Sequence, residues 1–165
     1  MKKIILVMLL LIMPITSFST ESGYGNTTWG MTPDEVLQAQ NGSQKLLPPE
    51  KYSNSTAKVK IDNVNIGSGM YTVNFLFDNS DHLTQTNVTS NEANNIGIIN
   101  LRFNELNKLL TQKYGKPEFQ NNDLVNWKNN STSIELRKMV IPGVTAKVMI
   151  RYTSSENLSN ETVNL

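Results

Sequence analysis

Two segments in which apolar and polar residues alternate constrain the fold of this chain most. In Met70–Asp78, one side of an extended strand would be apolar, while Thr72 and Asn74 would lie on the other side. The apolar positions are Tyr71, Val73, Phe75 and Phe77. Val144–Thr153 alternates in the same way, and its apolar positions are Ala146, Val148, Ile150 and Tyr152. One buried face and one more polar face are typical of an antiparallel sheet, which we therefore expect.

Shorter strands are expected over residues 56–61, 82–89, 124–128 and 132–139. Runs of Asp, Asn, Ser, Pro and Gly separate them and predict turns at 78–81, 129–131 and 142–143. Residues 62–69, with two glycines, are also interpreted as a turn region. We interpret Gln44–Ser55 as a connecting loop because it contains the pair Pro48-Pro49.

Two helices are expected. The first begins after Thr32, whose side chain can cap the helix, with Pro33 at its first position and Glu35 completing a capping box; it would end near Gln40. The second covers about Ile98–Tyr114 and has an apolar stripe at steps of three and four residues. The stripe consists of Ile99, Phe103, Leu106, Leu109 and Leu110. Gly115 and Pro117 mark its end.

The predicted order is a helix, about three strands, a second helix and three more strands. This order indicates an α+β fold in which two helices pack on one face of an antiparallel sheet, and its repetition suggests a duplicated αβββ unit. We expect a cleaved signal peptide over residues 1–19 and a polar lead-in over 20–28. A single α+β domain would cover residues 29–153, and a polar C-terminal tail would cover 154–165.

The leader has the three parts of a secretory signal. Lys2 and Lys3 form the positive region, Ile4–Ile15 is apolar, and Ser17 and Ser19 provide small residues at a cleavage site. The apolar run is shorter than the roughly 18 residues that span a bilayer. We therefore expect export to the periplasm or the outside of a bacterial cell, with no membrane anchor after cleavage.

Composition excludes several classes of protein and site. The chain has 165 residues, which suits one domain, and no cysteine, which excludes disulfides, thiol nucleophiles and zinc ribbons. Its 15 basic and 14 acidic residues are nearly balanced, and the basic residues are scattered rather than clustered. A nucleic-acid partner is therefore not expected. No cofactor or metal is expected either.

No catalytic motif stands out. His82 is the single imidazole and follows a turn that contains Asp78 and Asp81, which favours a solvated turn histidine over a catalytic base. The acidic turn lacks the glycine and closing glutamate of a calcium loop. Carboxylate candidates for hydrolysis are Glu105, Glu118 and Glu135, none of which forms a pair by spacing. Gly67-Ser68-Gly69 is interpreted as a turn rather than a phosphate loop.

Four residues are candidates for an interaction surface: Trp29, Tyr24, Trp127 and Arg151. An exposed tryptophan beside a tyrosine or arginine is a common protein-binding anchor or sugar-stacking platform. Burial is the alternative for both tryptophans, since Trp29 precedes a helix start and Trp127 alternates with Val125 on a strand. A second candidate surface is the polar sheet face, with Thr72, Asn74, Thr84 and Thr86, for which a hydrated exterior is the alternative.

Two short motifs resemble known bacterial envelope proteins. Gly30-Met31-Thr32 with Val36 resembles the first helix of the small lipoprotein of the β-barrel assembly machine and of β-lactamase-inhibitor-like domains. The fuller Trp29-Gly30-Met31-Thr32, with the later Tyr114-Gly115-Lys116-Pro117, is similar to secreted bacterial proteins of uncharacterised function. The lipid-anchoring cysteine and the disulfides of these relatives are absent. The resemblance implies a non-enzymatic envelope protein that binds other proteins.

The sequence therefore leaves three functions open. The first is an exported, non-enzymatic protein that binds another envelope or secreted protein as an inhibitor, immunity or accessory factor. The second is a binding module for cell-wall carbohydrate or a small ligand, and the third is a small hydrolase.

Overall fold

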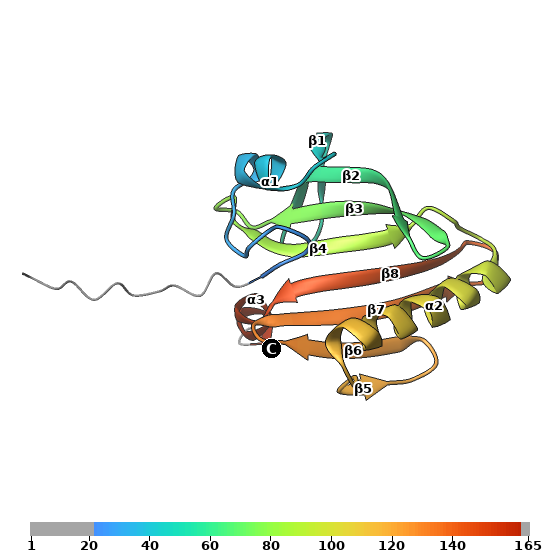
Figure 1. The fold of residues 1–165 in the computed structure, drawn as a ribbon. Helices are drawn as coiled ribbons and strands as arrows, with labels where there is room; N and C mark the ends of the chain where they lie inside the picture. The colour runs from blue at the N-terminus through green and yellow to red at the C-terminus, as the bar shows by residue number, and fades with distance from the viewer. Residues whose placement is uncertain (1–21, 163–165) are drawn as a thin grey trace, which may run out of the picture.

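The computed structural model describes residues 22–162, so the predicted leader lies outside the described residues. It confirms the α+β class, with an antiparallel sheet of eight strands and three helices (Figure 1). In chain order these are α1 (Pro33–Ala39), β1 (Gln44–Lys51), β2 (Thr56–Ile66), β3 (Gly69–Phe77), β4 (Leu83–Ser90), α2 (Ile96–Tyr114), β5 (Phe119–Gln120), β6 (Leu124–Asn129), β7 (Thr132–Ile141), β8 (Thr145–Ser154) and α3 (Ser155–Thr162).

The sheet is assembled from two similar halves. Each half contains one helix followed by four strands, and the strand order is β1-β2-β3-β4-β8-β7-β6-β5. The last strands of the two halves, β4 and β8, pair antiparallel at the centre of the sheet. The repeated unit thus has four strands rather than the predicted three. A duplication at the level of the sequence stays a prediction.

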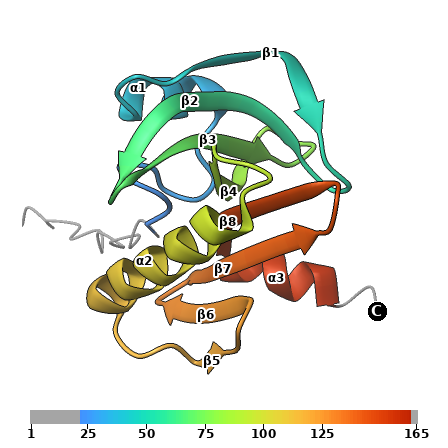
Figure 2. The ribbon, with the colours of Figure 1, turned by 90° about the vertical axis from the view of Figure 1, so that its right-hand side faces the viewer.

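One face of the sheet carries the core. The predicted apolar faces of β3 and β8 are confirmed, since their alternating residues are buried. Val36 of α1 and the buried residues of α2 belong to the same cluster as these strands. The buried residues of α2 are Ile99, Phe103, Leu106 and Leu110. Leu109, predicted in this stripe, is 37% exposed. Figure 2 shows α1 and α2 on one side of the sheet and α3 on the other.

The predicted start of the first helix is confirmed. Thr32 Oγ1 accepts a hydrogen bond from the Glu35 N–H at 3.4 Å, and Glu35 Oε2 accepts one from the Thr32 N–H at 2.7 Å. Both ends of this capping box satisfy donors that the first turn of a helix leaves unpaired. Because α1 has only seven residues, we infer that it depends on this cap and on Val36.

Thr32→Ala should lower the free energy of unfolding by about 1 kcal/mol, because it leaves the N-terminal donors of α1 without their side-chain acceptor. Urea denaturation followed by circular dichroism measures the change. Ser53→Ala in the exposed loop between β1 and β2 is the control and should leave the midpoint unchanged. Equal midpoints for Thr32→Ala and wild type would contradict the role of the cap.

The predicted loop over residues 44–55 is wrong in its first eight residues, which form β1. β1 lies at the edge of the sheet, and its pairing with β2 is irregular between Lys45 and Glu50. Pro48 and Pro49 fall inside this irregular stretch, where backbone N–H donors are not needed for a ladder. The predicted turn over 62–69 is also too long, because β2 continues to Ile66 through a bulge at Asn63, whose φ is 57°.

Both ends of the described chain are more ordered than the sequence indicates. In the predicted polar lead-in, Ser22 forms a β-bridge with Thr28, and Tyr24 packs edge-on against Phe75 and Tyr152, with ring centroids 6.1 and 5.5 Å apart. In the predicted polar tail, residues 155–162 form α3. The folded unit therefore covers the described residues from 22 onward rather than 29–153 alone.

Candidate interaction surface

The side of the sheet opposite the core carries polar and charged side chains, and we call it the open face. Its residues alternate along the strands with core residues, so their side chains project away from α1 and α2. Arg151, for example, lies between the buried Ile150 and Tyr152, and Glu135 lies between Ile134 and Leu136. Figure 2 shows that the sheet is strongly curved and that α3 lies on this side.

A row of six polar residues crosses the open face at the middle of the strands. Each member is the direct cross-strand partner of the next, from β2 to β6. The members, in order, are Lys60, Asn74, Asn87, Arg151, Glu135 and Asn126. We call this the polar row. Because neighbouring strands lie about 4.8 Å apart, the row is about 24 Å long.

The centre of the polar row is an ion-pair cluster. Glu135 accepts from Arg151 Nη2 at 3.2 Å and from Arg137 Nε at 3.0 Å, and its side chain is only 13% exposed. The hydrogen bond to Glu135, together with the charge of Glu135, raises the pKa of Arg137. One carboxylate between two guanidinium groups leaves this region with a surplus of positive charge. Both arginines keep exposed donors for an acceptor on another molecule.

Two amides on either side of this cluster have unused hydrogen-bonding capacity. The side-chain oxygens Oδ1 of Asn74 and Asn126 are buried and have no hydrogen-bond partner. Buried polar atoms without a partner are uncommon and call for a physical reason. Here both lie in the polar row, and neither belongs to the apolar core. Because both oxygens are buried, a donor on a partner would reach them only after the two side chains turn outward.

Methionines lie beside the polar row. Met70 and Met149 alternate with buried core residues, and Met139 follows Arg137 by two positions on β7, so all three lie on the open face. Met70 and Met139 are 48% and 46% exposed. Met149 pairs with Thr89 on β4 and with Arg137 on β7. Methionine is flexible and polarizable and is frequent at adaptable binding surfaces. The open face thus combines an apolar part with a charged part.

The structure separates the four residues predicted to form an interaction surface. Trp127 is 1% exposed on β6, and its indole N–H donates to the Gly115 carbonyl at 3.1 Å. It is a core residue and cannot contact a partner in this structure, which corrects its place in the predicted surface. Burial follows from its alternation with Val125, which is also buried.

The other three predicted residues lie in two places. Trp29 is partly buried against the core, and its indole N–H donates to Thr132 Oγ1 at 2.8 Å. Tyr24 is also partly buried against the core through its contacts with Phe75 and Tyr152. Of the four, Arg151 is the residue that lies on the open face, in the middle of the polar row.

The predicted polar surface needs one correction. Thr72 and Asn74 do lie on the open face, but Thr86 is completely buried and faces the core opposite Phe75. Gln85, Asn87 and Thr89 occupy the open face of β4 instead. The pairing of β3 with β4 shifts between Leu76 and Phe77, so the side-chain alternation of β4 differs on the two sides of this irregularity.

Two of the carboxylates considered for catalysis, Glu105 and Glu135, lie on opposite sides of the sheet. Glu135 lies on the open face, whereas Glu105 belongs to α2. The ring nitrogen Nδ1 of His82 lies 3.9 Å from Asp78 at an exposed turn. Across residues 22–162, no group of three or more His, Asp or Glu residues is arranged to hold a metal ion. In the same range no helix is long and apolar enough to cross a membrane.

Glu105 joins the two halves of the molecule. Its Oε1 and Oε2 accept hydrogen bonds from the N–H and O–H of Ser68 at 2.9 and 2.8 Å, and Arg102 lies 3.4 Å from Oε2. Ser68 is in the turn between β2 and β3, so this contact ties the first half to α2. Glycine is favoured at position 67, because its φ is 57° and a Cβ atom would lie 2.5 Å from Glu105 Oε1 and displace that carboxylate.

Glu105→Gln should destabilise the protein near neutral pH but not in acid. The hydrogen bonds from Ser68 lower the pKa of Glu105 below the ordinary value of 4.5. The contact therefore contributes fully above about pH 4.5 and is lost as the pH falls through the folded-state pKa. Urea midpoints at about pH 7 and about pH 2 measure this, with Glu92→Gln in an exposed loop as the control. An equal effect of Glu105→Gln at both pH values would exclude this linkage.

Comparison with known proteins places the chain in a family. No curated protein and no solved structure matches it. The two families that its short motifs resemble are not among the matches, so those resemblances stay predictions. One family model, described as the TP0088 domain, matches residues 22–162, which include every helix and strand described above. The chain therefore belongs to the TP0088 domain family.

Proposed function

We propose that this protein is an exported, non-enzymatic protein that binds another envelope or secreted protein through the open face of its sheet. The observation that carries the proposal is the polar row, in which the cluster of Arg151, Glu135 and Arg137 is flanked by two buried amide oxygens without partners. A partner that lies across the strands would contact the arginine donors together with the partly exposed side chains of Asn74 and Asn126.

The composition of the open face supports a protein as the partner. Arginine and methionine are enriched in protein interfaces, whereas lysine and aspartate are depleted. Three of the four methionines within the described residues lie on this face, and one of them, Met149, is the cross-strand partner of Arg137. The surplus of positive charge around Glu135 favours a partner whose matching surface is acidic.

A carbohydrate ligand is less well supported. Sugar-binding sites use exposed aromatic rings as stacking platforms. Neither tryptophan can act as a stacking platform, because Trp127 is buried and Trp29 packs against the core. The exposed aromatic residues Tyr52 and Phe119 lie next to β1 and in β5, at the two opposite edges of the sheet. They are too far apart to form one platform.

The remaining parts of the proposal rest on the sequence. The leader over residues 1–19 supports export, and the resemblance of Trp29-Gly30-Met31-Thr32 to envelope proteins supports a role in the bacterial periplasm or outside the cell. The carboxylates and the imidazole are used in ion pairs and turns rather than brought together. This arrangement favours a binding role over hydrolysis.

The experiment is affinity capture from periplasmic and secreted extracts with tagged residues 20–165 as bait, followed by mass spectrometry. We expect one stoichiometric protein partner. Thr89→Arg, which places a long side chain on the open face between Thr72 and Met149, should lower its recovery at least tenfold. Asn104→Arg, at an exposed position of α2, should leave recovery unchanged.

Folding of each bait is checked by circular dichroism. A folded bait that captures no protein, or a partner lost with Asn104→Arg but kept with Thr89→Arg, would contradict the proposal. In the first case a screen of cell-wall glycans follows, because binding there would support the carbohydrate alternative.

A further inference from the structure

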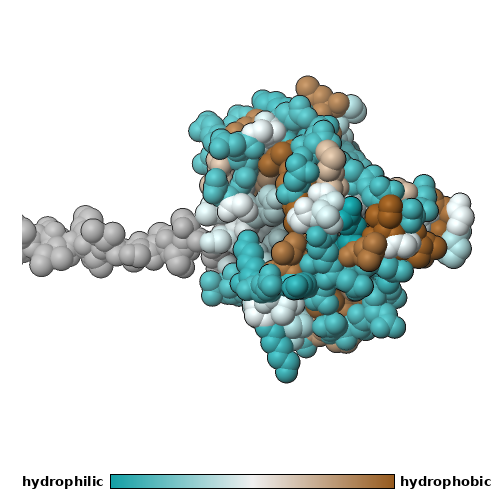
Figure 3. Space-filling model, turned by 45° about the vertical axis from the view of Figure 1, so that its right-hand side comes forward, coloured by the Kyte–Doolittle hydropathy of each residue, from teal (hydrophilic) through white to brown (hydrophobic). Residues whose placement is uncertain are grey.

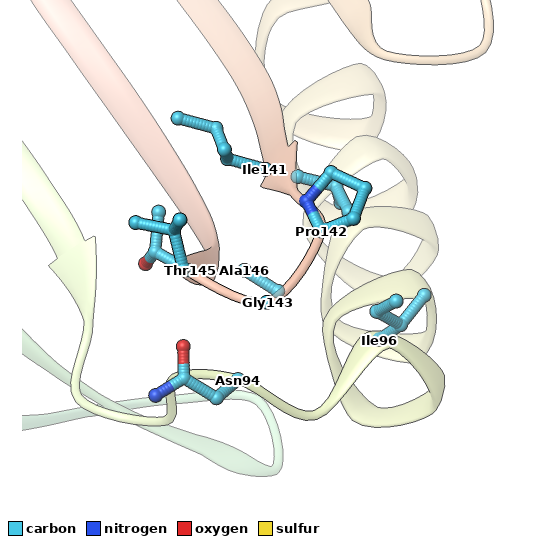
Figure 4. A pocket seen from close by; sticks show the side chains of 9 residues that line it. Asn94, Ile96, Ile141, Pro142, Gly143, Thr145 and Ala146 are labelled. Carbon is cyan, nitrogen blue, oxygen red and sulfur yellow. The ribbon is translucent and has the colours of Figure 1, made fainter.

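The end of the β7–β8 hairpin carries apolar side chains in positions exposed to solvent. Val144, Ile141, Met139 and Val140 are 69%, 47%, 46% and 37% exposed. Ile96, in the first turn of α2, is 51% exposed and lies across a pocket of about 280 Å³ from these residues (Figure 4). We call residues 139–144 together with Ile96 the hairpin tip. Figure 3 shows apolar surface gathered at the right-hand end of the molecule.

Both faces of the hairpin are apolar at the tip. Val140 pairs with the buried Ala146 on the core side, whereas Ile141 pairs with Thr145 on the side of the open face. A convex end that is apolar on both faces would need a deep matching cavity in a protein partner. A lipid bilayer needs no such cavity, because its acyl chains rearrange around the inserted group.

Most of the backbone of the tip is hydrogen-bonded, apart from the turn at Pro142 and Gly143. β7 and β8 remain paired up to Ile141 and Thr145, and the Val144 N–H donates to the Ile141 carbonyl at 3.0 Å. Pro142 has no N–H to satisfy, and the Asn94 N–H donates to the Ala146 carbonyl at 3.1 Å. An apolar medium penalises unpaired backbone groups severely, so this pairing permits the tip to leave water.

The charges of the hairpin itself are positive. Residues 138–148 contain no aspartate or glutamate, and their charged residues are Lys138 and Lys147. In the neighbouring loop, Glu92 is exposed two residues before Asn94, and Arg102 lies farther along α2. Lys138 is paired with Asp123 at 3.1 Å, and Arg102 contacts Glu105. Lys147 has no hydrogen bond or ion pair in the part of the chain that the structure describes, and it lies opposite Met139 on the open face. An unpaired cation beside exposed apolar residues is complementary to an anionic membrane surface.

We propose that the hairpin tip docks reversibly onto an anionic lipid bilayer, with the tip in the interfacial region and Lys147 at the level of the headgroups. The contact is peripheral and requires neither a spanning helix nor a lipid anchor. The proposed protein partner would contact the middle of the open face, and Met139 is the one residue that the two proposed surfaces share.

The test is flotation of residues 20–165 with vesicles of phosphatidylcholine, alone or with about one third phosphatidylglycerol. We expect binding to the anionic vesicles and about fivefold weaker binding to neutral ones, because one unpaired lysine near an anionic surface contributes about 1 kcal/mol. The double variant Ile141→Asp and Val144→Asp should lose at least tenfold in binding to anionic vesicles. Leu47→Asp, at a position that is 79% exposed on the far edge of the sheet, should bind as wild type does.

A second measurement remains informative if the double variant fails to fold. Val144→Trp should show quenching of its fluorescence by brominated phosphatidylglycerol in excess of that of wild type. No flotation of wild type, unchanged binding of a folded double variant, or absence of this quenching would overturn the proposal. Loss of a captured protein with unchanged vesicle binding in the double variant would assign the tip to a protein interface instead.

Discussion

Trp127→Ala should lower the free energy of unfolding by about 3–5 kcal/mol, which is a large part of the stability of a domain of this size. Trp127 is among the largest fully buried side chains, and it belongs to the same core cluster as Leu106 and Leu110 of α2. Its removal leaves a cavity and frees the Gly115 carbonyl, which accepts the indole hydrogen bond. Urea denaturation at neutral pH measures the change.

Two controls separate loss of packing from loss of the hydrogen bond. Trp127→Phe retains most of the apolar volume and should lower the free energy of unfolding by less than Trp127→Ala does. Leu47→Ala removes an apolar side chain that is 79% exposed and should change the unfolding free energy by less than about 0.5 kcal/mol. A wild-type unfolding midpoint for Trp127→Ala would show that β6 does not contribute to the core as described.

Arg151→Met should weaken binding of the captured protein partner at least tenfold, equivalent to about 1.4 kcal/mol or more. The substitution keeps the aliphatic stem but removes the charge and the donors at the centre of the polar row. Glu135 retains its hydrogen bond with Arg137 at 3.0 Å, so the fold should be preserved. Surface plasmon resonance with immobilised partner measures the dissociation constant.

Lys108→Met is the matched control for Arg151→Met. Lys108 is exposed on α2, on the side of the sheet opposite the open face, and its substitution removes the same charge. We expect the affinity of Lys108→Met for the partner to stay within about twofold of that of wild type. A charge remote from an interface acts on the partner mainly through the long-range electrostatic field of the protein. Equal losses for the two variants would indicate a general charge effect rather than contact at the open face.

The parts of the fold that depend on local signals were predictable from the sequence. The capping box of Thr32 and Glu35 and the end of α2 at Gly115 arise from neighbouring residues, and both are confirmed. The buried faces of β3 and β8 follow from strict alternation over eight or more residues. These signals need no knowledge of which strands pair.

The parts that depend on distant pairing were not predictable. β1 contains two prolines and becomes a strand through its pairing with β2 at the sheet edge. The apolar residues Leu83 and Val88 of β4 are five positions apart, so in a regular strand their side chains would point to opposite faces. Alternation alone therefore did not decide whether Thr86 or Asn87 faces the core. The polar row joins residues from six strands and exists through the pairing of β4 with β8, which links the two halves. Its individual members look like ordinary surface residues in the sequence.

Site-specific cross-linking tests the central proposal, binding at the open face, most directly. Because the chain contains no cysteine, Thr89→Cys and Asn104→Cys each introduce one attachment point for a photoreactive probe, on the open face and on α2 respectively. After exposure to an exported extract and illumination, we predict an adduct of higher mass from Thr89→Cys and none from Asn104→Cys. An adduct from Asn104→Cys alone, or no adduct from either folded variant, would contradict binding of a protein at the open face.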